Sequence, residues 1–262
     1  MNTAVPAKPV VTEDLPVWAY WEGPCPPWIQ ACRQTLERHA STLRLLSPES
    51  FAVLWDRDRD IRIDRLCVAH RADFIRAFLL ARYGGLWVDS DCVVMRPLGP
   101  LLTQLKEHDF VAHRERSGFV SNGFIGARAG SPIAVEFYQR VCSTLRSGQS
   151  PGWISLGGEP LTHLLGRRDS SWLELPVESI QPICWSKPAE FFSQADAAEH
   201  EQHFDPTSLC YMLSNQEILK FQAKNPAADL LHPRSFFNFL LHRAQTPSSS
   251  EGALDLPLPV DT

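Results

Sequence analysis

The chain has 262 residues, of which 44% are hydrophobic and 21% charged, and its formal net charge at pH 7 is −5. This composition is typical of a globular protein with a sizeable core, and it lacks the basic excess of a protein that binds the phosphate backbone of nucleic acids. Seven cysteines without a CxxC pair argue against a disulfide framework or a zinc ribbon and favour a reducing compartment. No apolar run is long enough to span a membrane, and the N-terminus lacks the apolar core of a signal peptide. We therefore expect a cytoplasmic protein with no integral membrane span.

The two ends of the chain differ in composition from its centre. Residues 1–15 are rich in Pro, Ala and Val and predict a flexible N-terminus, and the low-complexity residues 246–262 predict a disordered tail. No internal repeat or long linker divides residues 16–245, which we expect to form a single domain. Twenty-one prolines, concentrated after residue 150, predict a loop-rich C-terminal half.

Strands and helices alternate along the sequence. In chain order, the patterns predict a strand over Val17–Trp21, a helix over Pro27–His39, a strand over Leu43–Leu46, a helical region over Asp64–Tyr83 closed by Gly84-Gly85, strands over Leu86–Met95, Asp109–His113 and Phe119–Ala127, and helices over Pro132–Leu145 and Ser235–Ala244. This alternation predicts an α/β fold, with crossover helices flanking a central sheet.

The most distinctive local pattern is Asp89-Ser90-Asp91, which follows an apolar run. On a strand, the two aspartates project to the same side, and carboxylates so close repel each other unless a cation neutralises them. Mg²⁺ or Mn²⁺ would accept such oxygen ligands and leave positions free for a diphosphate. By itself, however, so short a motif is more often a polar turn after a strand.

The preceding helix carries His70, Asp73 and Arg76 at i, i+3 and i+6 on an otherwise apolar surface. A helix that is apolar nearly all round is buried, and buried charges need partners. Asp73 and Arg76 could form an internal ion pair, or the three residues could face a crevice and bind the ribose and phosphates of a nucleotide. The sequence leaves both alternatives open.

Four motifs in a fixed order carry a family resemblance over residues 17–130: Trp21-Glu22-Gly23 after a strand, Ala72-Asp73 with Arg76 on a helix, Tyr83–Asp91 (YGGLWVDSD), and Ser121–Ile125 (SNGFI). Together they resemble the capsular polysaccharide synthesis proteins, the yeast initiating mannosyltransferases and the catalytic domains of clostridial glucosylating toxins. The resemblance implies a GT-A-like fold with a Rossmann-like mixed sheet, and a hexosyltransferase that uses a UDP- or GDP-sugar, a Mn²⁺ or Mg²⁺ cofactor and retention of anomeric configuration.

The resemblance also implies a role for individual residues. Trp21, next to Tyr20, would stack on the base, while Asp73, Arg76 and the neighbouring His70 would hold ribose, sugar or phosphate. Asp89 would contact ribose and metal, and Asp91 would coordinate the metal. The remaining implied site residues are Ser121, Asn122 and Gly123 in the sugar pocket, and Glu159 near the reacting carbon, with Asn122 also a catalytic candidate.

One position departs from the family pattern. Ser208–Gln216 resembles a late strand that carries a histidine, and Met212 occupies the position of that histidine. The departure leaves a third protein ligand open and supports an alternative function, a catalytically inactive nucleotide-sugar-binding protein. A phosphatase of the haloacid dehalogenase type is rejected, because its aspartates follow the first strand and it needs a downstream G-D-x-x-x-D that this sequence lacks.

The resemblance to capsule-synthesis proteins implies an acceptor that is a growing surface glycan or its lipid-linked precursor, met transiently at the membrane face. The Pro-rich second half is expected to frame the acceptor crevice. There, Trp153 and Trp185 are expected either to stack on sugar rings or to pack in the core.

Overall fold

The computed structural model describes residues 14–56, 61–166 and 172–246, in two compact units. Unit 1 comprises Met1–Glu22, Thr42–Val88 and Leu101–Glu174, and unit 2 comprises Gly23–Ser41, Asp89–Pro100 and Leu175–Thr262. The single domain expected over residues 16–245 stays a prediction. The flexible N-terminus and the disordered tail expected at the two ends lie, but for a few residues, outside the described ranges.

Unit 1 is built on a six-stranded sheet with the strand order β2-β1-β3-β6-β5-β7. The strands are β1 (Val17–Tyr20), β2 (Leu43–Leu46), β3 (Gly85–Val88), β5 (Phe110–His113), β6 (Phe124–Ala127) and β7 (Trp172–Leu175). β1 pairs in parallel with β2 and β3, whereas β6 pairs antiparallel with β3 and β5. All residues of β1 and β3 are buried, as the continuous apolar run of a central strand requires. The mixed α/β sheet predicted from the sequence is confirmed.

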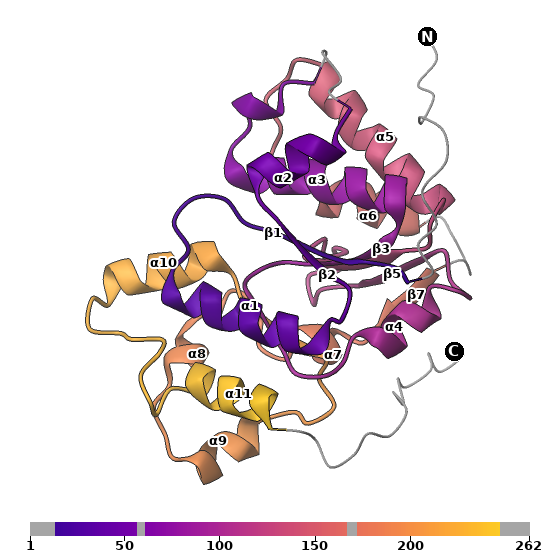
Figure 1. The fold of residues 1–262 in the computed structure, drawn as a ribbon. Coiled ribbons are helices and arrows are strands. Elements are labelled where there is room, and N and C mark those ends of the chain that lie inside the picture. Colours follow the sequence, from indigo (N-terminus) through magenta and orange to yellow (C-terminus); the bar gives the residue numbers. More distant parts are fainter. Residues whose placement is uncertain (1–13, 57–60, 167–171, 247–262) are drawn as a thin grey trace. The chain divides into compact units, whose positions relative to one another are not determined.

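Helices α2 (Pro48–Leu54), α3 (Val68–Tyr83), α5 (Pro132–Arg146) and α6 (Gly158–Leu165) lie on one face of this sheet (Figure 1). A short 3₁₀ helix, η1 (Ile63–Arg65), precedes α3. α3 packs mainly against α5, and its residues from Asp73 to Ala81 are all buried. The core of unit 1 therefore surrounds α3, which explains why that helix is apolar on nearly every side.

Glycines end α3 as predicted, and β3 begins at the second of them, one residue before the predicted start at Leu86. Gly84 caps α3 with φ +68°, and Gly85 follows with φ +100°. Residues other than glycine rarely adopt these backbone conformations. A Cβ on Gly85 would also overlap the carbonyl oxygen of Pro16. The N–H of Leu86 donates to that same oxygen at 2.9 Å, so β3 starts in direct contact with the residue before β1.

The single strand predicted over Leu86–Met95 is wrong, and so is the strand geometry inferred for its aspartates. β3 ends at Val88, a turn follows in which the Cys92 N–H donates to Asp89 O at 3.2 Å, and β4 (Cys92–Val94) belongs to a second sheet. Aspartates favour turns because their side chains compete with strand hydrogen bonds. Asp89 and Asp91 therefore lie in a turn and do not share one side of a strand.

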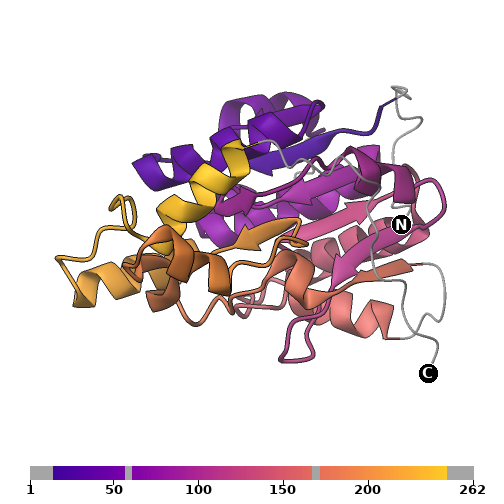
Figure 2. The same cartoon turned by 90° about the horizontal axis from the view of Figure 1, so that it is seen from below.

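Unit 2 contains a two-stranded antiparallel sheet of β4 and β8 (Cys210–Met212). Its helices are α1 (Pro27–His39), α7 (Val177–Ile180), α8 (Ala189–Phe192), α9 (Ala197–His203), α10 (Asn215–Lys224) and α11 (Phe236–Gln245), while α4 (Gly99–Gln104) leads back into unit 1. α1 packs against β4 and α11 (Figure 2), where Trp28 and Phe237 meet edge to face at 6.3 Å. None of the described helices is long and apolar enough to cross a membrane.

Candidate functional site

Two of the predicted site residues form a buried charged pair on α3. Asp73 and Arg76 are 8% and 4% exposed, and Arg76 Nη2 lies 3.6 Å from Asp73 Oδ1. Arg76 Nη1 also donates to the backbone oxygen of Asn122 at 2.7 Å, and its guanidinium lies over the ring of Trp87 at 5.0 Å. The ion pair considered from the sequence is thus present, but it belongs to a larger network that reaches β3 and the segment before β6.

Asn122 joins this network through its side chain as well. Its Nδ2 donates to Asp73 Oδ1 at 2.7 Å, so the same carboxylate oxygen accepts from the carboxamide and faces the guanidinium. The neighbouring Ser121 is buried, and its Oγ accepts from the Gly123 N–H at 3.4 Å, which fixes the turn. The structure therefore brings together Asp73, Arg76 and Asn122, three residues that the sequence assigned to one site.

The start of α6 adjoins the same segment. The N–H of Val120 donates to Thr162 Oγ1 at 2.8 Å, and Thr162 Oγ1 in turn donates to Gly158 O at 2.6 Å. Glu159, the predicted catalytic carboxylate, lies exposed in the first turn of α6. Its side chain therefore lies outside the core. The helix that carries it is hydrogen-bonded, through Thr162, to Val120, two residues before Asn122.

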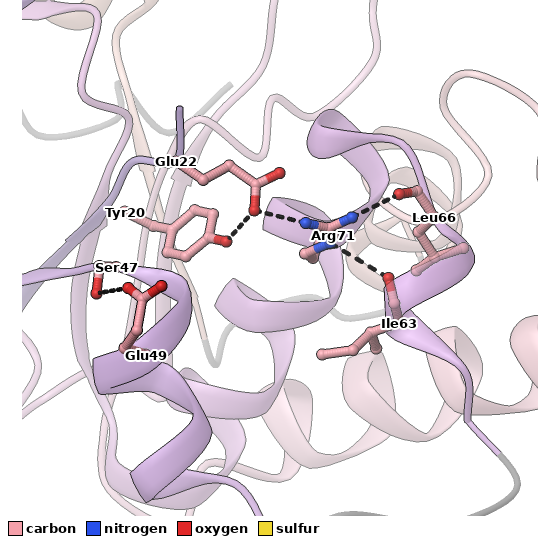
Figure 3. Close-up of polar contacts among 7 residues, drawn as sticks. All are labelled: Tyr20, Glu22, Ser47, Glu49, Ile63, Leu66 and Arg71. Atoms are coloured by element: carbon pink, nitrogen blue, oxygen red, sulfur yellow. Dashed lines mark hydrogen bonds and ion pairs between the residues drawn. The ribbon is translucent and has the colours of Figure 1, made fainter. Parts of the chain in front are cut away.

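A second polar cluster at the end of β1 joins Tyr20, Glu22 and Arg71 (Figure 3). The Tyr20 hydroxyl and Arg71 Nη1 each donate to Glu22 Oε2 at 2.6 Å. Arg71 also donates to the backbone oxygens of Ile63 at 3.2 Å and Leu66 at 2.9 Å. Burial and the adjacent Glu22 carboxylate raise the pKa of Tyr20 well above its usual range, so the phenol stays protonated as a donor.

Tyr20 was predicted from the sequence as a site residue, whereas Glu22 and Arg71 were not. Glu22 stands inside the W-x-G motif and Arg71 directly follows His70, yet 49 positions separate them and no local periodicity pairs them. The only signal was their opposite charge beside two predicted motifs.

A cavity of about 590 Å³ adjoins this cluster in unit 1. Its lining includes Tyr20, Phe51, Trp55, Ile61, Ile63 and Arg71. Aromatic and aliphatic walls with a few polar groups are typical of small-molecule pockets, and this volume lies in their usual range. Trp21 is partly buried, and its backbone N–H donates to Leu46 O at 3.0 Å. It is not among the described residues that line the cavity.

His70 lies beside an exposed tryptophan. The rings of His70 and Trp153 are 6.3 Å apart, and Trp153 is 61% exposed. Within the described residues, His70 Nε2 is buried and has no hydrogen-bonding partner. Trp185, in unit 2, is 40% exposed. Of the two alternatives considered for these tryptophans, core packing is therefore excluded.

In unit 2, Asp91 lies at the N-terminus of α10. Its Oδ2 accepts from the Asn215 N–H at 2.8 Å and its backbone oxygen accepts from the Leu213 N–H at 3.1 Å. Asn215 Oδ1 is a buried oxygen without a hydrogen-bonding partner among the described residues. Met212 is buried in β8 opposite Cys92, so a thioether occupies the position of the family's histidine.

These groups bear on whether a divalent cation fits. Two carboxylates and an unsatisfied carboxamide oxygen are hard donors of the kind that Mg²⁺ and Mn²⁺ prefer, whereas the Met212 thioether is soft. No group of three or more His, Cys, Asp or Glu side chains within the described ranges is arranged to hold a metal ion. Asp91 and the Asn215 oxygen, which lie at the start of α10, are therefore of the chemical kind that could hold such a cation.

A comparison with known protein families matches the N-terminal half of the chain, which contains Asp73, Arg76 and Asn122. Residues 6–125 match the model of a family described as "Capsular polysaccharide synthesis protein". Over 169 residues, the chain is 30% identical to glycosyltransferase afumC of Aspergillus fumigatus (strain CBS 144.89 / FGSC A1163 / CEA10), a match that covers 54% of this chain. It covers 43% of that protein, so the chain spans less than half the length of this curated relative.

Two solved structures match the chain, and the first of them is similar in fold. The apo form of WbbM, a bifunctional glycosyltransferase, matches with a TM-score of 0.52 and 12% identity, over 91% of this chain and 51% of that chain. The apo form of glycosyltransferase GlyE from Streptococcus pneumoniae TIGR4 matches with a TM-score of 0.48 and 16% identity, over 90% and 66%. The resemblance to capsular-synthesis glycosyltransferases and the GT-A-like α/β fold class are confirmed.

Proposed function

We propose that the chain is a metal-dependent hexosyltransferase that transfers a sugar from a UDP- or GDP-sugar to a glycan or lipid-linked acceptor in surface polysaccharide synthesis. The observation that carries the proposal is the buried network of Asp73, Arg76 and Asn122, which lies within the segment that matches the family. Buried ion pairs contribute little net stability, because desolvation offsets their attraction. Charges retained in a core helix are therefore better explained by binding of a polar ligand.

The residues of unit 1 are suited to the organic parts of the donor. Asp73 and the Asn122 carboxamide can accept and donate hydrogen bonds to hydroxyls of ribose or sugar, and Arg76 supplies positive charge towards a phosphate. The cavity lined by Tyr20, Phe51 and Trp55 has the volume and the apolar walls for a base. Trp21 remains a candidate for stacking on it, and His70 for a polar contact.

In the reaction, the bond between the sugar anomeric carbon and the diphosphate oxygen breaks as an acceptor hydroxyl bonds to that carbon and loses its proton. The nucleoside diphosphate leaves with the bonding electrons, so positive charge near it, such as that of Arg76, stabilises the transition state. Glu159 is exposed and can accept a proton or stabilise charge near the reacting carbon. Retention of configuration is included in the proposal on the resemblance alone.

Asp89 and Asp91 would hold the divalent cation. Asn215 Oδ1 is the candidate for a third protein ligand, since Met212 stands at the position of the histidine in the family pattern. When bound, Mn²⁺ or Mg²⁺ would neutralise charge on the diphosphate leaving group. The acceptor would be met on the cytoplasmic side, at the membrane face, where the exposed Trp153 and Trp185 can stack on sugar rings. Met212 favours one alternative, an inactive nucleotide-sugar-binding protein.

The test compares the wild type with Asp91→Asn in a panel of UDP- and GDP-sugars, with Mn²⁺ and with EDTA. Asparagine keeps an oxygen that can accept from the Asn215 N–H but loses the negative charge. We expect sugar transfer or donor hydrolysis to fall by about 100-fold or more in the variant and in EDTA, with an unchanged melting temperature. Glu107→Gln, which removes an exposed carboxylate, is the matched control.

Undiminished activity in EDTA or in Asp91→Asn would contradict the metal-dependent mechanism. Tight binding of a nucleotide sugar without turnover by the wild type, under all conditions, would instead establish the inactive binding protein.

A further inference from the structure

Gly157 lies directly against the side chain of Asn122. A Cβ built on Gly157 would be 2.7 Å from Asn122 Cγ and closer still to its Nδ2, well inside van der Waals contact. Gly157 is buried, with φ −132° and ψ −97°. A side chain at this position therefore has no space beside the Asn122 carboxamide.

The atoms that Gly157 approaches are those that hold Asp73. Asn122 Nδ2 donates to Asp73 Oδ1 at 2.7 Å, and its amide group thus lies between the Gly157 backbone and the α3 carboxylate. The backbone of Asn122 is fixed separately, because its oxygen accepts from Arg76 Nη1. Any side chain at position 157 would have to displace the carboxamide while leaving the main chain of Asn122 in place.

The next residue offers a matched comparison. A Cβ on Gly158 would have the backbone oxygen of Val120 as its neighbour, at 3.1 Å. It would have no atom of Asn122 within 4 Å. Both glycines lie at the start of α6, Gly157 as its N-cap and Gly158 as its first residue. An alanine at either position has the same effect on the unfolded chain, so a difference between the two variants reports on the folded contacts.

We propose that Gly157 is a positioning residue for the donor sugar, acting through Asn122. The absence of a side chain at position 157 lets the Asn122 carboxamide reach Asp73 in one orientation, which presents both groups to the hydroxyls of the sugar of a nucleotide sugar. The inference rests on the proposed function, since it concerns the same donor. It assigns to α6 a role in the orientation of the sugar, in addition to carrying Glu159.

A double-mutant cycle with Asn122→Ala tests this role, because that substitution removes every Asn122 atom that a Cβ at position 157 would overlap. We expect Gly157→Ala alone to lower kcat for sugar transfer or donor hydrolysis by about 10- to 100-fold, the cost of a misplaced contact of about 1 Å. The affinity for UDP or GDP, which carry no sugar, should change by less than about 2-fold. In the Asn122→Ala background, Gly157→Ala should cost less than about 2-fold more in kcat.

Gly158→Ala, the control, should stay within about 3-fold of the wild type in kcat. If Gly157→Ala lowers the melting temperature of the wild type, it should lower that of Asn122→Ala much less, because the overlap is absent in that background. Equal losses from Gly157→Ala in both backgrounds, or no loss in either, would overturn the inference while the proposed function stands. A wild type that neither binds nor turns over any nucleotide sugar would overturn both.

Discussion

Glu22 is the residue on which the polar cluster at the end of β1 depends. Its side chain is 9% exposed, and one of its oxygens accepts from both the Tyr20 hydroxyl and the Arg71 guanidinium. Glu22→Gln removes the charge that Arg71 faces and replaces one acceptor by a donor. We expect the free energy of unfolding to fall by about 1–3 kcal/mol, because the half-buried guanidinium of Arg71 is left poorly paired. Urea denaturation followed by circular dichroism measures this.

Glu49 provides the control for that measurement. It is exposed, and its carboxylate accepts from Ser47 Oγ at 2.7 Å, a contact also drawn in Figure 3. Glu49→Gln should change the unfolding midpoint little, as exposed polar contacts contribute little. Equal effects of the two substitutions would show that the Glu22 cluster does not stabilise unit 1.

His113 makes the stability of the fold depend on pH. It is fully buried in β5, and burial lowers its pKa from 6.5 to about 4, with a smaller opposing effect from the backbone of Phe124. Between these two pH values the unfolded chain binds a proton at His113 that the folded chain does not. The free energy of unfolding therefore has its full value above pH 6.5 and falls as the pH is lowered towards 4. The change amounts to at most about 3 kcal/mol.

The corresponding measurement is urea denaturation at several pH values from 7 to 4. His113→Leu, which cannot titrate, should have a smaller fall in stability over this range than the wild type. His242→Leu, at an exposed position, should keep the wild-type slope. The same slope in His113→Leu as in the wild type would assign the pH dependence to other groups.

At the scale of elements, the junction between α3 and β3 is the most constrained backbone described above. Gly85 combines a φ of +100° with contact against Pro16 O. Gly85→Ala should therefore lower the free energy of unfolding by about 3 kcal/mol or more, through strain and displacement of the segment before β1. Thermal denaturation measures the loss. Gly99→Ala, where a Cβ meets nothing within 4 Å, should leave the melting temperature nearly unchanged.

The elements that could be predicted are those whose bounds are set by local chemistry. α1 and β2 have the predicted bounds, because an amphipathic period after prolines and a short apolar run between polar turns are complete within a few residues. The break between β3 and β4 could not be predicted in the same way. It depends on the partners, since β3 pairs with β1 and β6 whereas β4 pairs with β8 from the far end of the chain.

The candidate site likewise contains residues that local patterns predicted and contacts that only the tertiary structure shows. Asp73 and Arg76 were predicted from a spacing on one helix, and Asn122 from a motif, and the structure brings all three together. The pairing of Glu22 with Arg71 and the contact of Gly157 with Asn122 depend on tertiary structure, and no local periodicity in the sequence indicates either of them.

At the scale of the whole molecule, bound cation and nucleotide should stabilise the chain, because they bind the folded state alone. We expect Mn²⁺ with UDP or GDP to raise the melting temperature, by an amount equivalent to about 2.7 kcal/mol when the ligand is at 100 times its Kd. Asn215→Ala removes the buried Oδ1 and keeps the N–H that donates to Asp91. It should reduce the shift caused by Mn²⁺, whereas Gln216→Ala, at the exposed next position, should not.

Full retention of the Mn²⁺ shift in Asn215→Ala would exclude its side chain as a ligand. No shift in the wild type, with either nucleotide, would contradict cation binding by the chain as a whole.

The interleaving of the two units has a consequence for synthesis on the ribosome. Unit 2 is assembled from three segments, and α1 and β4 belong to the first two, while β8 and α11 belong to the last. The chain is made from its N-terminus, so unit 1 can complete its segments at Glu174 while β4 still lacks β8 and α1 still lacks α11. The apolar residues of α1 and the unpaired edge of β4 are then open to other chains until Leu175–Thr262 emerges. The nascent chain should therefore need a chaperone most during the translation of its last third.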